Sequence, residues 1–240
     1  MSIAERFETA LVATSEPQLA GPELLPVRLA RAVARTLRVD GAGLSLLDAA
    51  QERIPLGSSS DIAETAERLQ FTVGEGPCMA AQTSRQPVFA VEQDLRRRWP
   101  GFTGLLFDAT PYRAVVALPL QPAPTGPGAI DLYFTRSEDV PGLDVFEAVA
   151  VGGLVSSALA DAALWSTWSP EEGPAWLHGP VPQRRAAVWE AMGKVSVALE
   201  VTVPAALDLL RARAYGSGTS VDDVAAQLLS GGLRPDDLRP

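Results

Sequence analysis

Residues 165–182 read WSTWSPEEGPAWLHGPVP, and this stretch divides the chain. Its four prolines and two glycines prevent the continuous backbone hydrogen bonding that a helix or a sheet requires. Tryptophan side chains gather here, because four of the five lie in or just after the stretch, at Trp165, Trp168, Trp176 and Trp189. Such apolar bulk indicates a linker that packs on a surface. The sequence predicts a linker at 166–182, between a first domain at 1–165 and a smaller one at 183–240.

The composition is that of a folded protein whose charge is unevenly divided. The chain has 240 residues, of which 47% are hydrophobic and 20% charged, and this excludes disorder as the main state. Its net charge is −9. Residues 1–179 hold 13 basic and 22 acidic side chains, whereas residues 180–240 hold 7 of each. The acidity therefore belongs to the first domain.

One cysteine, Cys78, and one histidine, His178, limit the chemistry. A single cysteine excludes an intramolecular disulfide and a Cys-rich zinc site, and a single histidine excludes a metal centre with two His ligands. These counts exclude most hydrolase and metalloenzyme functions, because the sequence offers no set of nucleophile, base and orienting group. We predict no enzyme activity and no metal, and we interpret His178 as a surface residue of the linker.

The N-terminus, MSIAERFETALVATSE, carries charges where an export signal needs an apolar stretch. The longest apolar run, 148–160, has thirteen residues, too few to span a bilayer, and indicates a buried helix. We expect a soluble cytoplasmic protein with no membrane partner.

The first domain alternates helical and extended patterns. Helical apolar spacing appears at 22–39, with arginines on the opposite side, and helical patches follow near 61–69 and 101–108. Short apolar runs bounded by turn residues predict strands at 42–48, 53–58, 87–91, 114–120 and 129–135. This order predicts an α+β domain with a mainly antiparallel sheet and flanking helices.

A longer helix is predicted at 142–165, where apolar residues recur at helical spacing. Its small residues, Gly152, Gly153, Ser156 and Ser157, would let a partner helix come close. Two roles remain open for this helix, a dimer interface or packing under the sheet.

The second domain is predicted to be all-α, with helices at 184–199, 203–215 and 221–229. Thr202 and Ser220 are expected N-caps, and Ser220 with Asp223 resembles a capping box. Fewer than sixty residues make a marginal core. We therefore expect this unit to lean on the 142–165 helix, on the linker tryptophans or on a second copy.

Two motifs in the chain carry a family resemblance. Residues 185–233, RAAVWEAMGKVSVALEVTVPAALDLLRARAYGSGTSVDDVAAQLLSGGL, resemble an ANTAR domain of the actinobacterial kind. In the first domain GEGPC at 74–78, Asp94-Leu95, Trp99-Pro100 and the strand ending ALPL at 117–120 are similar to GAF domains that precede ANTAR domains. The positions that match the ANTAR pattern are Ala191, Gly193, Val195, Ser196, Ala206, Leu210, Arg211, Ala214, Val224 and Ala225.

The resemblance implies a transcription antitermination regulator. Such proteins bind paired RNA stem-loops as dimers, and an attached sensor domain controls the binding. Two units held by a dimeric sensor would grip two loops with a gain in effective concentration. Splayed loop bases can stack on aromatic or guanidinium planes. We accordingly expect RNA contacts from Arg184, Arg185, Lys194, Arg211, Arg213 and Tyr215, and close helix packing from Ala191, Gly193, Ala206, Leu210, Ala214, Val224 and Ala225.

Alternatives stay open for the second domain. Trp189 and Glu190 stand where the family often has uncharged polar residues, and Glu200 stands where Gly is common. Two added negative charges weaken phosphate affinity, so this unit could serve dimerisation alone, its RNA binding lost. A DNA-binding helix-turn-helix is disfavoured, because Asp222 and Asp223 begin the last helix.

The GAF resemblance implies a sensor pocket for an unknown small-molecule ligand. Candidate lining residues are Ser45, Phe71, Cys78, Phe89, Phe102 and Phe107, although aromatic residues in such a domain also serve as plain core. A thiolate at Cys78 would be favoured by a helix start after Pro77, but a buried apolar role is commoner. No haem-attachment spacing occurs, and no cofactor is predicted.

Overall fold

The computed structural model describes residues 1–47, 53–123, 126–165 and 173–239. Within these ranges the first domain is built on a five-stranded sheet of order β2-β1-β5-β4-β3, in which every pairing is antiparallel. The predicted α+β class with an antiparallel sheet is confirmed. The strands are β1 (Gly41–Leu47), β2 (Arg53–Ser58), β3 (Val88–Ala90), β4 (Ala114–Ala123) and β5 (Gly126–Phe134).

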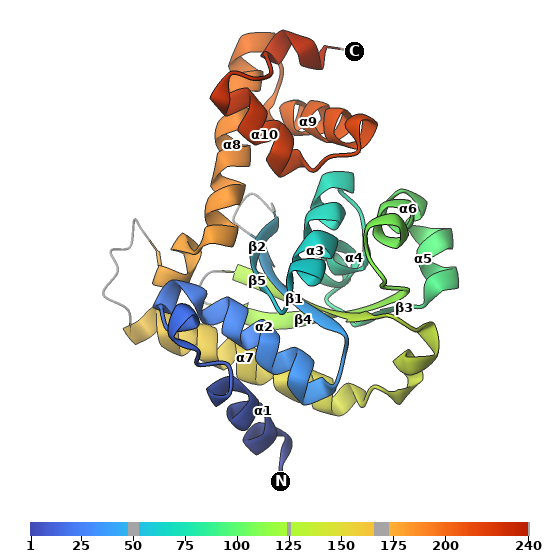
Figure 1. The fold of residues 1–240 in the computed structure, drawn as a ribbon, viewed down its shortest axis with the longest axis vertical. Helices are drawn as coiled ribbons and strands as arrows, with labels where there is room; N and C mark the ends of the chain where they lie inside the picture. Colours follow the sequence, from blue (N-terminus) through green and yellow to red (C-terminus); the bar gives the residue numbers. More distant parts are fainter. Residues whose placement is uncertain (48–52, 124–125, 166–172, 240) are drawn as a thin grey trace.

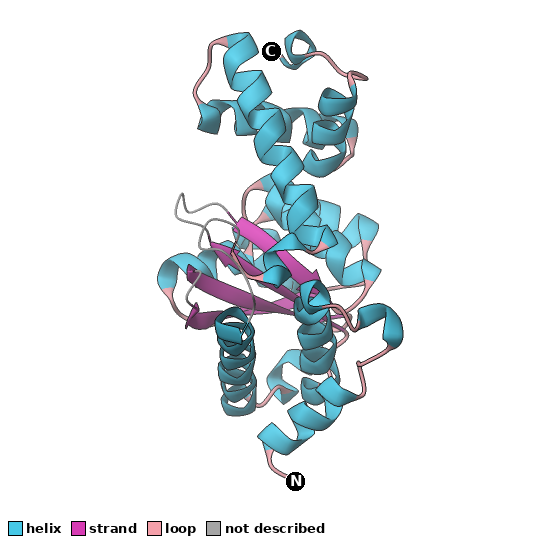
Figure 2. Cartoon of the chain, turned by 90° about the vertical axis from the view of Figure 1, so that its left-hand side faces the viewer, coloured by secondary structure: helices cyan, strands magenta, loops and turns pink. Residues whose placement is uncertain are grey.

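One face of the sheet is covered by two helices, α2 (Leu25–Leu37) and α7 (Val145–Trp165), and α1 (Ile3–Val12) packs on these two helices (Figure 1, Figure 2). Successive side chains of a strand point to opposite faces, so Val116 and Leu132 turn toward these helices. They pack with Leu29 of α2 and Val155 of α7, both fully buried. Packing under the sheet, one of the two roles predicted for the 142–165 helix, is thereby observed.

The other face is covered by α3 (Asp61–Val73), α4 (Pro77–Ser84), α5 (Glu92–Arg98) and α6 (Pro100–Ala109) (Figure 1). Ser60 caps α3 by accepting a hydrogen bond from the Ala63 amide at 3.2 Å. The helix ends at Gly74, whose φ of +78° is accessible to glycine at little cost. These caps fix the length of α3, which reaches from the sheet to the C-terminal helices.

Three helices follow the linker: α8 (Pro180–Leu199), α9 (Val203–Ser217) and α10 (Val221–Ser230), with a short 3₁₀ turn, η5, at Pro235–Leu238. We call α8–η5 the helical unit. The expected caps are present, since Thr202 accepts from Ala205 and Ser220 forms a capping box with Asp223. The first helix begins four residues before its predicted start, because proline is tolerated in the first turn of a helix.

The described part of the linker, from residue 173 onward, packs on the first domain, as the sequence predicts for the whole linker. Its short 3₁₀ helix η4 (Ala175–His178) buries Trp176, which is 1% exposed, in the core beneath the sheet. Trp189 is half-buried against the core of the helical unit. The side chains of Trp165 and Trp168 lie outside what the structure describes.

The support of the helical unit differs from the expectation. Its apolar core includes Phe71 of α3, and α3 contacts both α9 and α10. The predicted supports were the 142–165 helix, the linker tryptophans or a second copy, whereas the structure shows α3 packed against the unit. The reason is that α3 extends beyond its predicted end at 69, and the extra turn carries Phe71.

Candidate functional site

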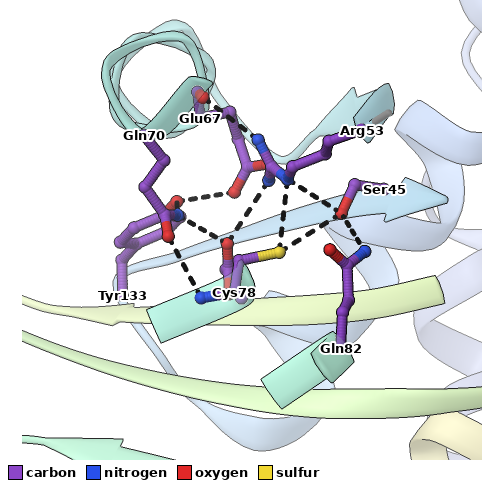
Figure 3. Close-up of polar contacts among 8 residues, drawn as sticks. Ser45, Arg53, Glu67, Gln70, Cys78, Gln82 and Tyr133 are labelled. Carbon is purple, nitrogen blue, oxygen red and sulfur yellow. Dashed lines mark hydrogen bonds and ion pairs between the residues drawn. The ribbon is translucent and has the colours of Figure 1, made fainter. Parts of the chain in front are cut away.

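A buried polar cluster lies between the sheet and helices α3 and α4 (Figure 3). Eight side chains meet there although the sheet, α3 and α4 supply mostly apolar residues around them. Each is no more than 8% exposed. The polar cluster consists of Ser45 of β1, Arg53 of β2, Glu67 and Gln70 of α3, Cys78 and Gln82 of α4, and Asp131 and Tyr133 of β5.

Arg53 is the hub of the polar cluster. Its Nη2 pairs with Glu67 Oε2 and lies 3.5 Å from Asp131 Oδ2. Its Nη1 donates to the Glu67 carbonyl at 3.2 Å, and its Nε donates to Ser45 Oγ and Cys78 Sγ, each at 3.2 Å. A buried guanidinium needs such partners, since removal of a charge from water is costly. Arg53, on the edge strand β2, thereby ties β1 and the central strand β5 to α3 and α4.

Gln70 links the two carboxylate-bearing elements. Its Nε2 donates to Asp131 Oδ2 at 2.7 Å, and its Oε1 accepts from the Cys78 amide at 3.1 Å. The Tyr133 hydroxyl donates to Glu67 Oε1 at 2.5 Å. The polar cluster therefore holds α3 at two points one turn apart, Glu67 and Gln70.

Charge in the polar cluster is unbalanced if both carboxylates ionise, because Arg53 is its single cation. Burial raises the pKa of Asp131 well above its usual range, and the nearby Glu67 raises it further. Asp131 Oδ1 has no hydrogen-bond partner among the described residues. Arg53 opposes this rise in the pKa of Asp131, and its closer carboxylate partner is Glu67.

A cavity of about 100 Å³ opens beside the polar cluster. Gln82, which is 6% exposed, lines it, and its Oε1 has no hydrogen-bond partner among the described residues. Arg211 of α9 closes one side, so the cavity lies between the first domain and the helical unit. Its described lining is Leu47, Arg53, Phe71, Met79, Gln82, Thr83 and Arg211.

A second set of contacts docks the helical unit on α3. Arg68 Nη2 lies 2.5 Å from Ser220 Oγ and 2.9 Å from Asp223 Oδ1, at the start of α10. The Thr72 hydroxyl accepts from the Val221 amide at 3.2 Å. The last bond satisfies an orphan N–H of the α10 N-terminus, whereas Arg68 donates to side-chain oxygens of the N-cap and the first turn. We call this set, with the Phe71 contacts below and the ion pair of Arg184 with Glu64 of α3, the docking interface.

Phe71 lies between two arginines of the helical unit. The guanidinium carbon of Arg185 is 3.2 Å from the centre of the Phe71 ring, and that of Arg211 is 5.1 Å away. Arg211 Nε also donates to the Phe71 carbonyl at 3.2 Å. Burial lowers the pKa of Arg185 to about 9, with Asp222 at 3.7 Å opposing that shift. Both arginines therefore face α3.

The six residues expected to contact RNA do not form one surface. Arg184 pairs with Glu64 of α3, Arg185 is 1% exposed, and Arg211 is half-buried. Lys194 Nζ donates to the Leu228 carbonyl of α10 at 2.7 Å. Arg213 and Tyr215 are exposed, the latter at 52%. As arranged here, the docking interface holds three of the five expected cations.

The expected packing residues lie mostly where close packing needs them. Ala191, Ala206, Leu210, Ala214, Val224 and Ala225 belong to the core of the helical unit and are at most 1% exposed. Gly193 differs, because a Cβ placed there would meet nothing within 4 Å. Its small size serves no helix contact in this arrangement.

The expected sensor-pocket residues are spread over several places. Ser45 and Cys78 belong to the polar cluster, and Phe71 lines the cavity next to it. Phe102 is fully buried apolar core, Phe89 is 39% exposed, and Phe107 lies under Arg96 and Arg113. The six residues therefore do not line one pocket, because Phe102 and Phe107 pack in the apolar core at α6 and Phe89 is partly exposed on β3.

Several site residues escaped the sequence analysis, namely Arg53, Glu67, Arg68, Gln70, Gln82, Asp131 and Tyr133. Asp131 had a usable signal, because it interrupts the apolar strand AIDLYF at 129–134, where a charge is expensive. No described group of three His, Cys, Asp or Glu side chains is placed to hold a metal ion.

Comparison with known proteins finds structural neighbours alone. No family model and no curated protein matches the chain. It is similar to the GAF domain of an Acinetobacter phosphoenolpyruvate-protein phosphotransferase, at 13% identity and a TM-score of 0.44, over 70% of this chain and all of that one. It is also similar to a free methionine-R-sulfoxide reductase from Neisseria meningitidis, at 14% identity and a TM-score of 0.43, over 66% and 86% of the two chains. At this degree of similarity the neighbours' activities do not extend to this chain.

Proposed function

We propose that this protein is a cytoplasmic, dimeric, RNA-binding antitermination regulator whose first domain acts as a GAF-type sensor. The docking interface is the observation that carries this proposal. Arg184, Arg185 and Arg211, for which the ANTAR resemblance implies RNA contact, all contact α3. While these arginines contact the sensor domain they are not available to RNA, which is a polyanion. The sensor domain can thereby control RNA binding directly.

Helix α3 is the physical link between sensing and output. Its Glu67 and Gln70 belong to the polar cluster, while Arg68, Phe71 and Thr72 belong to the docking interface. A small ligand in the adjoining cavity would touch Arg53 on one side and Arg211 on the other. A ligand that binds the docked and released arrangements unequally shifts the population between them.

Release would free the arginines for RNA. Two helical units in a dimer would then engage two stem-loops, with the second contact made at high effective concentration. RNA binding and docking on α3 thus compete for the same arginine side chains. The sensor domain sets the fraction of molecules in which these side chains are free to bind RNA.

Gel-shift titration against tandem short hairpins at two salt concentrations tests the proposal. Arg68→Ala removes the Ser220 and Asp223 contacts without removing any residue expected to bind RNA. We expect it to bind the hairpins about 5- to 150-fold more tightly than the unsubstituted protein, the range of ordinary coupling energies. Arg97→Ala, which breaks an exposed ion pair with Asp94 on α5, is the matched control and should leave the affinity for the hairpins unchanged.

A second candidate function is signal sensing with a helical unit that no longer binds RNA. It is favoured by the burial of Arg185 and by the exposed acidic side chains of Glu190 and Glu200. Hairpins bound no more tightly than a scrambled control at low salt, by both the unsubstituted protein and Arg68→Ala, would establish this alternative and exclude the first.

A further inference from the structure

The cavity beside the polar cluster is shared by two parts of the chain. Arg53 of β2, Phe71 of α3 and Gln82 of α4 line it from the first domain. Arg211 of α9 lines it from the helical unit. A molecule bound in the cavity touches both parts only while the helical unit is docked. Such a molecule therefore acts on the docking equilibrium, and the lining decides which molecules fit.

The described lining of the cavity carries positive charge and no carboxylate. Arg53 and Arg211 are its charged residues, whereas Glu67 and Asp131, which pair with Arg53, are not among the lining residues. Arg211 Nη1 lies 3.9 Å from Asp208 Oδ1, but the side chain of Asp208 is 78% exposed, and an ion pair in water is weak. The lining therefore favours an anion, which Arg211 can bind in place of Asp208.

Gln82 adds a buried hydrogen-bond acceptor to the cavity. Its side chain is 6% exposed, and its Nε2 donates to Ser45 Oγ at 3.5 Å (Figure 3). Its Oε1 has no hydrogen-bond partner among the described residues. A buried amide oxygen without a partner costs free energy, and a bound donor removes that cost. The molecule that fits best therefore carries a hydroxyl or amino group besides its negative charge.

The rest of the lining is mostly apolar, and the space is small. Leu47, Phe71 and Met79 are walls against which inorganic phosphate would bury no apolar surface. The volume is about 100 Å³. A cavity of about 150 Å³ holds benzene, which has about six non-hydrogen atoms, whereas drug-sized ligands occupy about 300 Å³ or more. The cavity therefore suits an acid of about three carbons and is too small for a nucleotide.

We propose that this cavity binds a small carboxylic acid with a hydroxyl or amino group on the neighbouring carbon, and that the acid stabilises the docked arrangement. The carboxylate pairs with Arg211 beside the positive charge of Arg53, and the hydroxyl or amino group donates to Gln82 Oε1. Release of the helical unit removes Arg211 from the cavity, so the acid binds the docked arrangement more tightly.

The regulatory meaning of this site rests on the proposed function. By stabilising docking, the acid keeps the arginines of the docking interface on α3 and lowers the affinity for RNA. Binding of the acid, and its effect on docking, do not depend on RNA and are measured without it.

Isothermal titration calorimetry of the full chain with lactate tests the site. Acetate, which has the carboxylate without the hydroxyl, and lactamide, which lacks the charge, are the matched probes. We expect lactate to bind with a Kd of about 1 mM, an affinity within reach of about six non-hydrogen atoms. Each matched probe should bind about tenfold more weakly, because one hydrogen bond or the ion pair is lost. Inorganic phosphate should bind no more tightly than acetate.

Substitutions separate the two contacts. Gln82→Leu should bind lactate and acetate equally, because the acceptor for the hydroxyl is gone. Arg211→Met keeps a long side chain without the charge and should weaken the binding of both acids by at least about tenfold. Arg234→Met, at an exposed arginine that pairs with Asp237 in the helical unit, is the control and should leave both affinities unchanged. In the unsubstituted protein, lactate should slow hydrogen exchange at residues 214–224.

Absence of lactate binding up to about 20 mM would overturn the proposal, as would unchanged binding in Arg211→Met. Phosphate bound more tightly than lactate would overturn the carboxylic acid class, and equal binding of lactate and acetate by the unsubstituted protein would overturn the contact with Gln82. Faster exchange at 214–224 in lactate would overturn the stabilisation of docking. These measurements contain no RNA, so their failure is distinguishable from failed hairpin binding. If both proposals hold, about 10 mM lactate should weaken hairpin binding by up to about tenfold.

Discussion

The guanidinium carbon of Arg185 stands 3.2 Å from the ring centre of Phe71, although 114 positions separate the two residues in the chain. Phe71 belongs to α3 of the first domain, yet it is 1% exposed and lies in the core of the helical unit. The helical unit, too small to have a large core of its own, thus borrows one aromatic residue from its neighbour. Any change that moves α3 therefore acts on the helical unit directly.

Phe71→Ala should destabilise the protein by about 3–5 kcal/mol, because a buried ring is lost and a cavity remains. Phe71→Leu keeps much of the apolar volume and removes the contacts of the ring with Arg185 and Arg211, worth about 0.5–2 kcal/mol. Urea denaturation followed by circular dichroism measures both. If the two variants lost the same free energy of unfolding, the apolar volume of the ring would not matter and the shared core would be refuted.

Arg68→Ala should loosen the helical unit without unfolding the first domain. Charged hydrogen bonds such as those to Ser220 and Asp223 are worth about 1.5–3 kcal/mol. We expect hydrogen exchange to speed up at residues 214–224 and to stay unchanged in strands β4 and β5. The exposed pair Arg97–Asp94 supplies the control, because Arg97→Ala breaks an ion pair of similar length far from α10. Unchanged exchange at 214–224 in Arg68→Ala would show that this arginine does not hold the docking interface.

Local patterns predicted the elements well and their assembly poorly. The strand at 53–58 and the N-caps Thr202 and Ser220 follow from residue spacing and side-chain chemistry that act within a few positions. The side of the helical unit that faces solvent depends on α3, which is distant in sequence. Arg185 and Arg211 are therefore typical surface residues by pattern and interface residues by structure.

The polar cluster was hidden for the same reason. Arg53 begins a strand, Glu67 lies on an amphipathic helix, and each is unremarkable in its own segment. Their pairing arises because the β2-β1-β5 order and the packing of α3 bring them to one place. Among these residues, Asp131 alone carries a signal in the sequence, because a carboxylate within an apolar strand indicates a buried polar partner.

Cys78 should resist thiol reagents in the folded protein. Burial raises the pKa of its thiol, although the charge of Arg53 opposes this, and the side chain is fully buried. At pH 8 we expect labelling by a disulfide reagent to run at least roughly a hundredfold slower than in denaturant, where one thiol per chain reacts. Rapid labelling of the native protein would mean that α4 opens readily and that the polar cluster is exposed to solvent.

Asp131 should give the protein a pH dependence of distinctive sign. Its folded-state pKa is raised above that of the unfolded chain, so between the two values the native state binds more protons than the unfolded state. Stability therefore falls as pH rises through that window, from about 4 upward. Asp131→Asn cannot ionise and retains an oxygen that can accept from Gln70, so its stability relative to the unsubstituted protein should be more favourable at pH 8 than at pH 5. Urea denaturation at the two pH values measures this difference, with the exposed Asp108→Asn as control. If Asp131→Asn were instead relatively more stable at pH 5 than at pH 8, Asp131 would be stabilised as a carboxylate by Arg53. The proton assigned to Asp131 would then lie elsewhere in the polar cluster.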